Sequence, residues 1–229
     1  MKKIKFVSLM MSALLILGSC NMSNTAKGGI IGGGSGAAIG GVLGNIFSGK
    51  SDKGKVTAIG AAIGTAVGTG VGILIGKKMD KAKAAAEQVA NAQVESIQDA
   101  NGLQAVKVTF DYGILFDFNS SNLKDAAKKS LSEFSNILKS NADMDVAIFG
   151  HTDKAGSLEA NQKVSKQRAQ SVQNYLNGLG VSNSQIVTVE GKDYQEYDDA
   201  KTAAENRRVE VYLYASKEMI EAASNGTLQ

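Results

Sequence analysis

The sequence contains no proline, no tryptophan, a single cysteine and a single histidine among its 229 residues. One cysteine excludes a disulfide within the chain, and one cysteine with one histidine cannot build a zinc site of the Cys/His type. His151 has no G-x-S-x-G partner, so a serine hydrolase is disfavoured. A glycosidase needs two placed carboxylates, and Asp117 with Asp153 is the one obvious pair. We predict that the protein is not an enzyme and binds no metal.

Net charge is also small. The formal value is +3, and the three lysines at positions 2, 3 and 5 account for all of it, so removal of residues 1–19 would leave a formal charge of zero. A near-neutral chain lacks the basic surface that general nucleic-acid binding requires.

The first 20 residues have the pattern of a lipoprotein signal. A basic start precedes an apolar run, Phe6 to Leu17, that is too short to span a bilayer. The run ends in Leu17-Gly18-Ser19-Cys20, which resembles a bacterial lipobox. The resemblance implies cleavage after residue 19 and fatty acylation (palmitate) of Cys20, with no other cofactor. The alternative is an ordinary secretory signal with an incidental cysteine. Asn21 is not an acidic retention signal, which favours the outer membrane, and residues 20–27 would form a linker.

Glycine is concentrated in residues 28–76, where much of it recurs with a period of four. The series comprises Gly28, Gly32, Gly36, Gly40, Gly44, Gly60, Gly64, Gly68, Gly72 and Gly76. Each glycine costs a water-exposed helix about 1 kcal/mol relative to alanine, whereas in lipid a flat glycine face lets helices pack closely. The stretch resembles a glycine-zipper domain. This implies a hairpin of two helices, 30–48 and 56–76, in or against a membrane, with homo-oligomerisation left open. The alternative is a flexible linker.

Residues 77–103 change in character. The segment from Lys77 to Ala100 is alanine-rich, charged and free of glycine, which predicts a solvated helix that ends at Asn101-Gly102. A thin apolar stripe runs along it. We expect a helical spacer that holds the next domain away from the membrane, or that packs on that domain.

Residues 104–215 have the pattern of a globular α/β (α+β) domain. Alternating apolar residues predict strands at 106–110, 145–149, 186–189 and 208–214. Helices are expected after 116–123, with Ser121 or Asn122 as the cap, and from about Ser157 to Gly178. The order βαβαββ implies a mixed sheet with two helices on one face. In the tail, 216–229, the stretch KEMIEAAS could form one short helix.

The helix after Ser157 carries polar residues on its apolar side. The apolar stripe comprises Leu158, Ala169, Val172, Leu176 and Leu179. At about 100° per residue, Asn161, Ser165 and Arg168 lie on the same stripe. Polar groups that face a core cost free energy unless each has a partner. The sequence therefore predicts bonds, to the protein or to a ligand, for all three.

Several motifs occur in order over this domain: FDF at 116–118, GHTDxxG at 150–156, an asparagine at 161, S-xx-RA at 165–169 and NRRVEVYL at 206–213. Together they resemble the OmpA-like peptidoglycan-associated domain. The resemblance implies a periplasmic domain that binds the diaminopimelate-containing stem peptide of peptidoglycan without a covalent bond. It assigns ligand contact to Asp153, Arg168, Asn161 and Asp117. It assigns weaker candidates at Thr152, Ser165, Asn206 and Arg207.

The chemistry of that ligand suits the residues. The free end of diaminopimelate is a zwitterion, so Asp153 would accept from its ammonium and Arg168 would bind its carboxylate. The alternative is a structural salt bridge between Asp153 and Arg168. His151 and Arg208 are expected to be structural.

Two positions depart from the family pattern. Val164 replaces the usual leucine, and Ala203 stands where the family usually has arginine, in a loop that also lacks the usual proline. We therefore expect the loop 192–204 to differ in shape.

The predicted protein is thus an outer-membrane lipoprotein that binds peptidoglycan and tethers the outer membrane to it. The alternative is a membrane oligomer, pore or scaffold built by the glycine zipper, with the C-terminal domain as an anchor.

Overall fold

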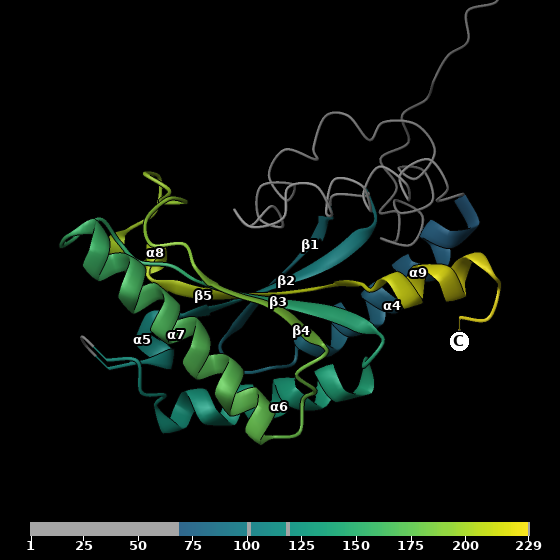
Figure 1. Ribbon diagram of the computed structural model, residues 1–229, viewed down its shortest axis with the longest axis horizontal. Helices are drawn as coiled ribbons and strands as arrows, with labels where there is room; N and C mark the ends of the chain where they lie inside the picture. The colour runs from purple at the N-terminus through teal and green to yellow at the C-terminus, as the bar shows by residue number, and fades with distance from the viewer. Residues whose placement is uncertain (1–68, 100–101, 118–119, 229) are drawn as a thin grey trace, which may run out of the picture.

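The computed structural model describes residues 69–99, 102–117 and 120–228. The predicted signal peptide, Cys20, the linker and the glycines from Gly28 to Gly68 lie outside the described residues. The described chain forms one sheet with helices (Figure 1). The strands are β1 (Ala92–Gln98), β2 (Gln104–Asp111), β3 (Met144–Gly150), β4 (Ile186–Gly191) and β5 (Arg208–Ala215). The helices are α4 (Thr69–Ala86), α5 (Tyr112–Leu115), α6 (Asp125–Ser140), α7 (Leu158–Gly178), α8 (Ala203–Asn206) and α9 (Lys217–Ser224).

The sheet is mixed and has the order β1-β2-β5-β3-β4. The strands β3 and β4 pair in parallel, joined by the crossover helix α7, and every other neighbouring pair is antiparallel. From β2 onward the long elements follow the predicted order βαβαββ, so the predicted fold class is confirmed. The last strand, β5, enters between β2 and β3, and it therefore connects the two halves of the sheet.

The predicted helical spacer is wrong in its second half. The helix α4 ends at Ala86, and Ala92–Gln98 forms the edge strand β1. This strand pairs antiparallel with β2 over its whole length, from Ala92 opposite Phe110 to Gln98 opposite Gln104. Ladder bonds to the otherwise open edge of β2 outweigh the helix propensity of the sequence. The turn between α4 and β1 contains Asn91 at φ 62°, a left-handed conformation that asparagine tolerates. Gly102, at φ 74°, belongs to the β1–β2 turn and is no helix stop.

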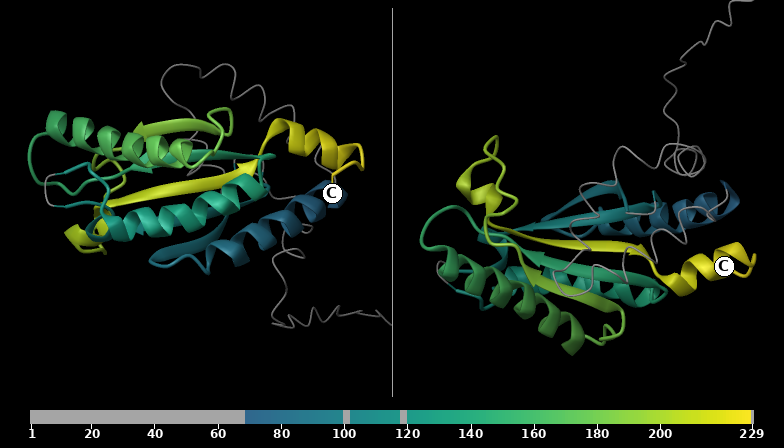
Figure 2. Two further views of the ribbon diagram at one scale, coloured as in Figure 1. Left: turned by 90° about the horizontal axis from the view of Figure 1, so that it is seen from below. Right: turned by 45° about the horizontal axis from the view of Figure 1, so that its top comes forward.

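The first half of this segment packs on the domain, the second of the two predicted arrangements. Ile75, Met79, Ala82 and Ala86 of α4 are buried in the main core. The helices α4, α6 and α7 lie across the same face of the sheet (Figure 2), so three long helices cover this face where two were predicted. The third arises because the spacer is part of the fold.

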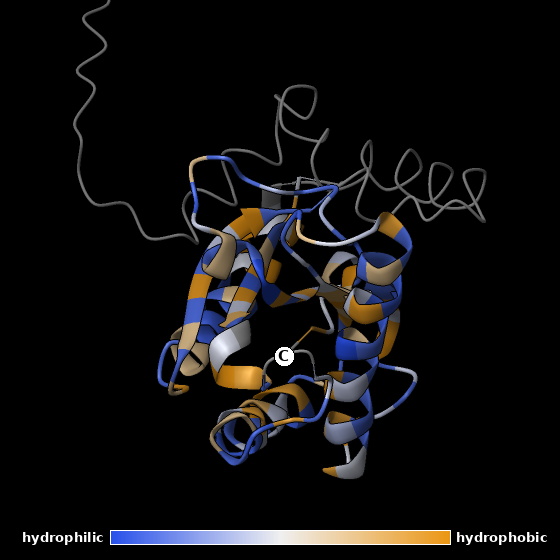
Figure 3. Ribbon diagram, turned by 90° about the vertical axis from the view of Figure 1, so that its left-hand side faces the viewer, coloured by the Kyte–Doolittle hydropathy of each residue, from blue (hydrophilic) through white to orange (hydrophobic). Residues whose placement is uncertain are grey.

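Hydrophobic and hydrophilic residues alternate along the strands (Figure 3). Val209, Val211 and Leu213 of β5 join the main core, whereas Tyr212 packs with Ala147 and Phe149 on the opposite face. The period of two along an extended strand assigns the side chains to the two faces.

The structure revises two local predictions and confirms two others. The residue before α6 is Lys124, which makes no side-chain cap bond, so neither Ser121 nor Asn122 is the cap. Leu158 is 47% exposed and does not belong to the apolar stripe of α7. In contrast, α7 begins where it was predicted to begin, after Ser157, whose side chain accepts from Ala160 N and caps the helix. The predicted short helix in the tail is α9, which packs against α4.

The two described glycines of the predicted zipper, Gly72 and Gly76, are buried residues of α4. None of the helices in the described part of the chain combines the length and the apolar character that crossing a membrane requires.

Two glycines let α7 lie directly on the carboxyl ends of β3 and β4. A Cβ atom at Gly191 would lie 2.3 Å from Ser165 Oγ and 2.4 Å from Lys166 N. At Gly150 it would lie 2.2 Å from Ser165 O. These distances are too short for any side chain. The middle of α7 can therefore lie against the strand ends only because both positions are glycine.

Gly191→Ala should lower the free energy of unfolding by about 2–3 kcal/mol, because the added methyl group collides with the α7 backbone, which cannot move without disturbing the core. Chemical denaturation measures this. Gly178→Ala is the matched control, since a Cβ there meets nothing within 4 Å. Equal stability of both variants would show that α7 is not held in this way.

Stability should also depend on pH through Asp145, which lies opposite Tyr214 on β5. Burial, and then the negative charge of Glu218, raise the pKa of Asp145 to about 6. The folded state therefore favours the protonated carboxyl, and this contribution is present below the ordinary value of about 4 and is lost as pH rises through 6.

Asp145→Asn should accordingly raise the melting temperature at pH 7.5 by about 2–4 °C, after allowance for partial solvent screening, with little change at pH 4. Thermal melts at the two pH values measure the difference. A gain that is independent of pH would contradict this account.

Candidate functional site

The predicted site residues come from three parts of the chain that meet at one end of the sheet. The loop between β3 and α7 carries Asp153, and β5 begins beside it because Gly150 pairs with Val209. The segment that follows α5 approaches the middle of α7, where Arg168 lies. Antiparallel pairing of β3 with β5 is thus what brings residues near 153 and 207 together.

Asp153 is held in a defined orientation. Its Oδ2 atom accepts from Arg207 Nη1 at 2.5 Å, and its Oδ1 atom accepts from Ala155 N at 3.0 Å. The side chain remains 17% exposed, and that of Arg207 is 33% exposed. The cation paired with Asp153 is therefore Arg207, and the predicted alternative of an Asp153–Arg168 salt bridge is wrong.

Arg168 contacts a different segment. Its Nε atom donates to the Ser120 carbonyl at 3.2 Å, and its guanidinium carbon lies 5.7 Å from the centre of the Phe116 ring. The side chain is buried. Asp117, next to Phe116, is exposed and pairs with Lys124 at 3.5 Å. The structure thus places Asp117 on the segment that Arg168 contacts.

The other two polar residues on α7 bond to backbone. Asn161 Nδ2 donates to Ala155 O at 2.8 Å, which ties the loop that carries Asp153 to the start of the helix. Ser165 Oγ donates to Gln162 O at 3.1 Å and accepts from Asp193 N at 3.2 Å. All three polar residues on the stripe therefore have protein partners, as their burial requires.

Thr152 and Asn206 are buried at the edges of this region. Thr152 N donates to Asp193 O at 2.8 Å, while its hydroxyl has no hydrogen-bond partner among the described residues. Asn206 accepts from Asp198 N at 2.8 Å and donates to the carbonyls of Asp198 and Thr202, both at 3.0 Å. Its amide thus fixes the loop before β5, which is an architectural role.

This loop contains the departures from the family pattern. Thr202 caps α8 in a capping box with Glu205, and Ala203 is the first residue of that helix. The hydrogen bonds of Thr202 lower the pKa of the Glu205 carboxyl below its usual value. A local cap therefore closes the turn that lacks proline.

A second polar cluster lies nearby on the face opposite the three long helices. Glu210 is buried, and it accepts from Arg208 Nε at 2.7 Å and from Tyr212 Oη at 2.6 Å. Burial alone would raise the pKa of Glu210, but His151, Arg208 and Tyr212 together hold it well below its usual range. His151 and Arg208, which were predicted to be structural, are both buried.

Comparisons with known proteins identify the family of this chain. Residues 115–210 match the model of the OmpA family, and residues 1–80 match that of the YMGG-like glycine zipper. The "Probable lipoprotein YiaD" of Escherichia coli (strain K12) is 30% identical over 220 residues, which cover 93% of this chain and 98% of that protein. The chain belongs to the OmpA family.

This OmpA-family chain is also similar to a second lipoprotein in sequence and to a solved structure in fold. The "Peptidoglycan-associated lipoprotein" of Pseudomonas aeruginosa is 34% identical over 119 residues, which cover 51% of this chain and 67% of that protein. A crystal structure of a MotB-like protein from Desulfovibrio vulgaris has a TM-score of 0.52 at 18% identity and covers 69% of this chain and 99% of that chain. The structural likeness supports the fold alone.

Two participants of the site, Ser120 and Asp193, and one pairing, Arg207 with Asp153, were not predicted from the sequence of this OmpA-family domain. The Ser120 carbonyl and Asp193 contact the polar residues of α7 through backbone atoms, which carry no residue-specific signal. The pairing of Arg207 with Asp153 depends on the register between β3 and β5. The motif NRR indicated that arginines matter here, but it did not identify their partners.

A double-mutant cycle tests this pairing. Asp153→Asn and Arg207→Gln should couple by about 0.5–1 kcal/mol in unfolding free energy, because the two charged groups contact each other directly and are partly buried. The cycle of Asp153→Asn with Arg168→Gln is the matched control and should couple by less than about 0.3 kcal/mol. A larger coupling energy for Asp153 with Arg168 than for Asp153 with Arg207 would mean that Asp153 pairs with Arg168 in solution.

Proposed function

We propose that this protein is an outer-membrane lipoprotein that binds diaminopimelate-containing peptidoglycan non-covalently and tethers the outer membrane to it. The observation that carries the proposal is the oriented carboxylate of Asp153, which keeps part of its surface exposed while Ala155 N and Arg207 define its direction. A carboxylate held in place in this way is ready to accept from a ligand ammonium without further ordering.

The ligand is a zwitterion, and the site offers both charges. Its ammonium would share Asp153 with Arg207, and its carboxylate would bind the Arg168 guanidinium in competition with, or in addition to, the Ser120 carbonyl. The bond from Asn161 to Ala155 would keep the loop at the distance from α7 that the ligand requires. Asp117, on the segment before α6, would lie at the edge of the site. Thr152, Ser165 and Asn206 would support the site through the backbone.

The anchoring part of the proposal rests on the N-terminal sequence and on the relatives. The lipobox ending at Cys20 supplies an acyl anchor, and the relative that this chain matches over nearly its whole length is called a lipoprotein. Two or three acyl chains are enough for stable membrane attachment. Wall binding at one end and an acyl anchor at the other together make a tether. We infer no catalytic step from the site.

Full-length protein in detergent should sediment with purified diaminopimelate-type peptidoglycan. Asp153→Asn and Arg168→Gln should each weaken the affinity for peptidoglycan at least about tenfold. The reason is that each change leaves one charge of the bound zwitterion without its partner. The matched control is Asp125→Asn with Lys128→Gln, an exposed ion pair on α6. Thermal melts establish that every variant is folded.

Peptidoglycan with lysine in place of diaminopimelate separates the two contacts. Lysine keeps the ammonium but lacks the carboxylate, so the wild type should bind this wall about as weakly as Arg168→Gln binds either wall. Sedimentation of both site variants at the wild-type level, or no sedimentation of the wild type, would refute the proposal.

The alternative of an oligomer, pore or scaffold built by the glycine zipper stays a prediction. Eight of its ten glycines lie outside the described residues, and the other two, Gly72 and Gly76, belong to α4.

A further inference from the structure

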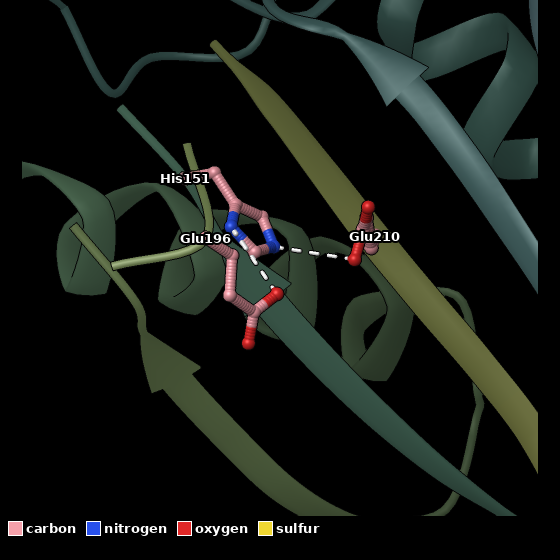
Figure 4. Close-up of side chains that lie close together, drawn as sticks. All are labelled: His151, Glu196 and Glu210. Carbon is pink, nitrogen blue, oxygen red and sulfur yellow. Dashed lines mark ion pairs between the residues drawn. The ribbon is translucent and has the colours of Figure 1, made fainter. Parts of the chain in front are cut away.

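Three potential metal-ligating side chains meet on the face of the sheet opposite α4, α6 and α7. His151 follows β3, Glu210 lies on β5 and Glu196 lies in the loop after β4. One ligand atom from each lies within 4.8 Å of the others. Figure 4 shows the two carboxylates converging on the imidazole ring from separate segments. The cluster contains none of the residues proposed to contact peptidoglycan.

The histidine is unusual because it is buried without good hydrogen bonds. His151 is 1% exposed, and neither ring nitrogen has a hydrogen bond of acceptable geometry among the described residues. Its Nε2 atom lies 3.3 Å from Glu210 Oε2, and its Nδ1 atom lies 4.0 Å from Glu196 Oε2. The second separation is too long for a hydrogen bond. Both nitrogens thus face carboxylate oxygens, which can accept but not donate.

Neither protonation state of the ring alone suits these surroundings. A neutral imidazole has one nitrogen lone pair, which here would face negatively charged oxygen without a donor. A protonated ring would direct one buried N–H toward an oxygen at 4.0 Å, which leaves that donor unsatisfied. A cation bound to Nε2 beside Glu210, with the Glu196 carboxylate drawn toward it, would use the lone pair and offset both negative charges, while Nδ1 keeps the proton.

Glu210 is already supported as a metal ligand would be. Its Oε1 atom accepts from Arg208 Nε at 2.7 Å and lies 3.9 Å from Lys107 Nζ, so these cations contact the oxygen away from the ring. Its Oε2 atom, which faces His151, accepts from Tyr212 Oη at 2.6 Å. Metal-binding carboxylates are commonly oriented by such outer hydrogen bonds.

Contrary to the prediction from the sequence that the protein binds no metal, we propose that His151, Glu196 and Glu210 bind one divalent transition-metal cation of the zinc class, with water completing the coordination. The 3.3 Å between His151 Nε2 and Glu210 Oε2 equals the spacing of two ligands in a tetrahedral shell with bonds of about 2.0–2.1 Å. Glu196 is exposed and lies on a loop, so its carboxylate can move the distance of up to about 1.5 Å that separates the present 4.8 Å from the ligand spacing of such a shell. One imidazole with two carboxylates favours zinc or manganese over calcium and magnesium, which prefer oxygen ligands alone.

Such a cation would connect the β4–α8 loop to the strands β3 and β5. His151 is two residues before Asp153, and the loop of Glu196 leads to α8 and Arg207. The inference does not depend on wall binding, and the site would stabilise the fold even if the proposed function failed, because a ligand that binds only the folded state raises its stability.

The test uses full-length protein in detergent, treated with EDTA and then dialysed. Zinc should bind with a stoichiometry of one by calorimetry and raise the melting temperature, and cobalt should give the visible absorption bands of a tetrahedral site. Calcium and magnesium should do neither. Glu196→Gln removes the exposed ligand with little risk to folding, and it should weaken zinc binding at least about tenfold and abolish the cobalt bands.

Glu190→Gln is the matched control, because Glu190 lies on the neighbouring β4 and pairs with Lys192 at 2.9 Å outside the cluster. It should bind zinc as the wild type does. His151→Gln should also lose zinc binding, but the buried ring makes its folding uncertain, so the test depends on Glu196→Gln. No zinc binding by the wild type, or equal binding by Glu196→Gln, would overturn the proposal.

Discussion

The insertion of β5 between β2 and β3 is the constraint on which most of this structure depends. Antiparallel ladders on both of its sides join the α4–β1–β2 part of the chain to the part built from β3, α7 and β4. The strand also begins beside the loop that follows β3, which places Arg207 at the predicted site and Arg208 beside Glu210. Without this placement, Asp153 would lose its ion pair and Glu210 would lie elsewhere.

The two arginines serve two different carboxylates. Arg207 pairs with the partly exposed Asp153, whereas Arg208 bonds to the buried Glu210. Asp153 keeps some exposed surface, whereas the buried Glu210 is surrounded by donors, as a buried carboxylate requires. The same end of the sheet therefore presents one charge outward and retains another inside.

The close approach of α7 to the strand ends sets the distance between the loop and the helix. Gly150 and Gly191 remove the side chains that would hold the helix away, and Ser165 then reaches Asp193 N across the contact. The polar residues on the core side of α7 become tolerable because backbone groups of neighbouring loops lie within hydrogen-bond reach. Burial of Asn161, Ser165 and Arg168 is thus a consequence of packing geometry as much as of any ligand.

The sequence alone determined the fold class, the order of the strands from β2 onward and the start of α7 at Ser157, because periodicity and capping are local properties. It also determined the short helix α9. It could not determine that Ala92–Gln98 is a strand, since alanine, glutamate and glutamine favour a helix until an open sheet edge is available. Nor could it identify Arg207 as the partner of Asp153 or join His151, Glu196 and Glu210 in one cluster. These contacts depend on strand register and loop position, which only the packing of the whole chain decides.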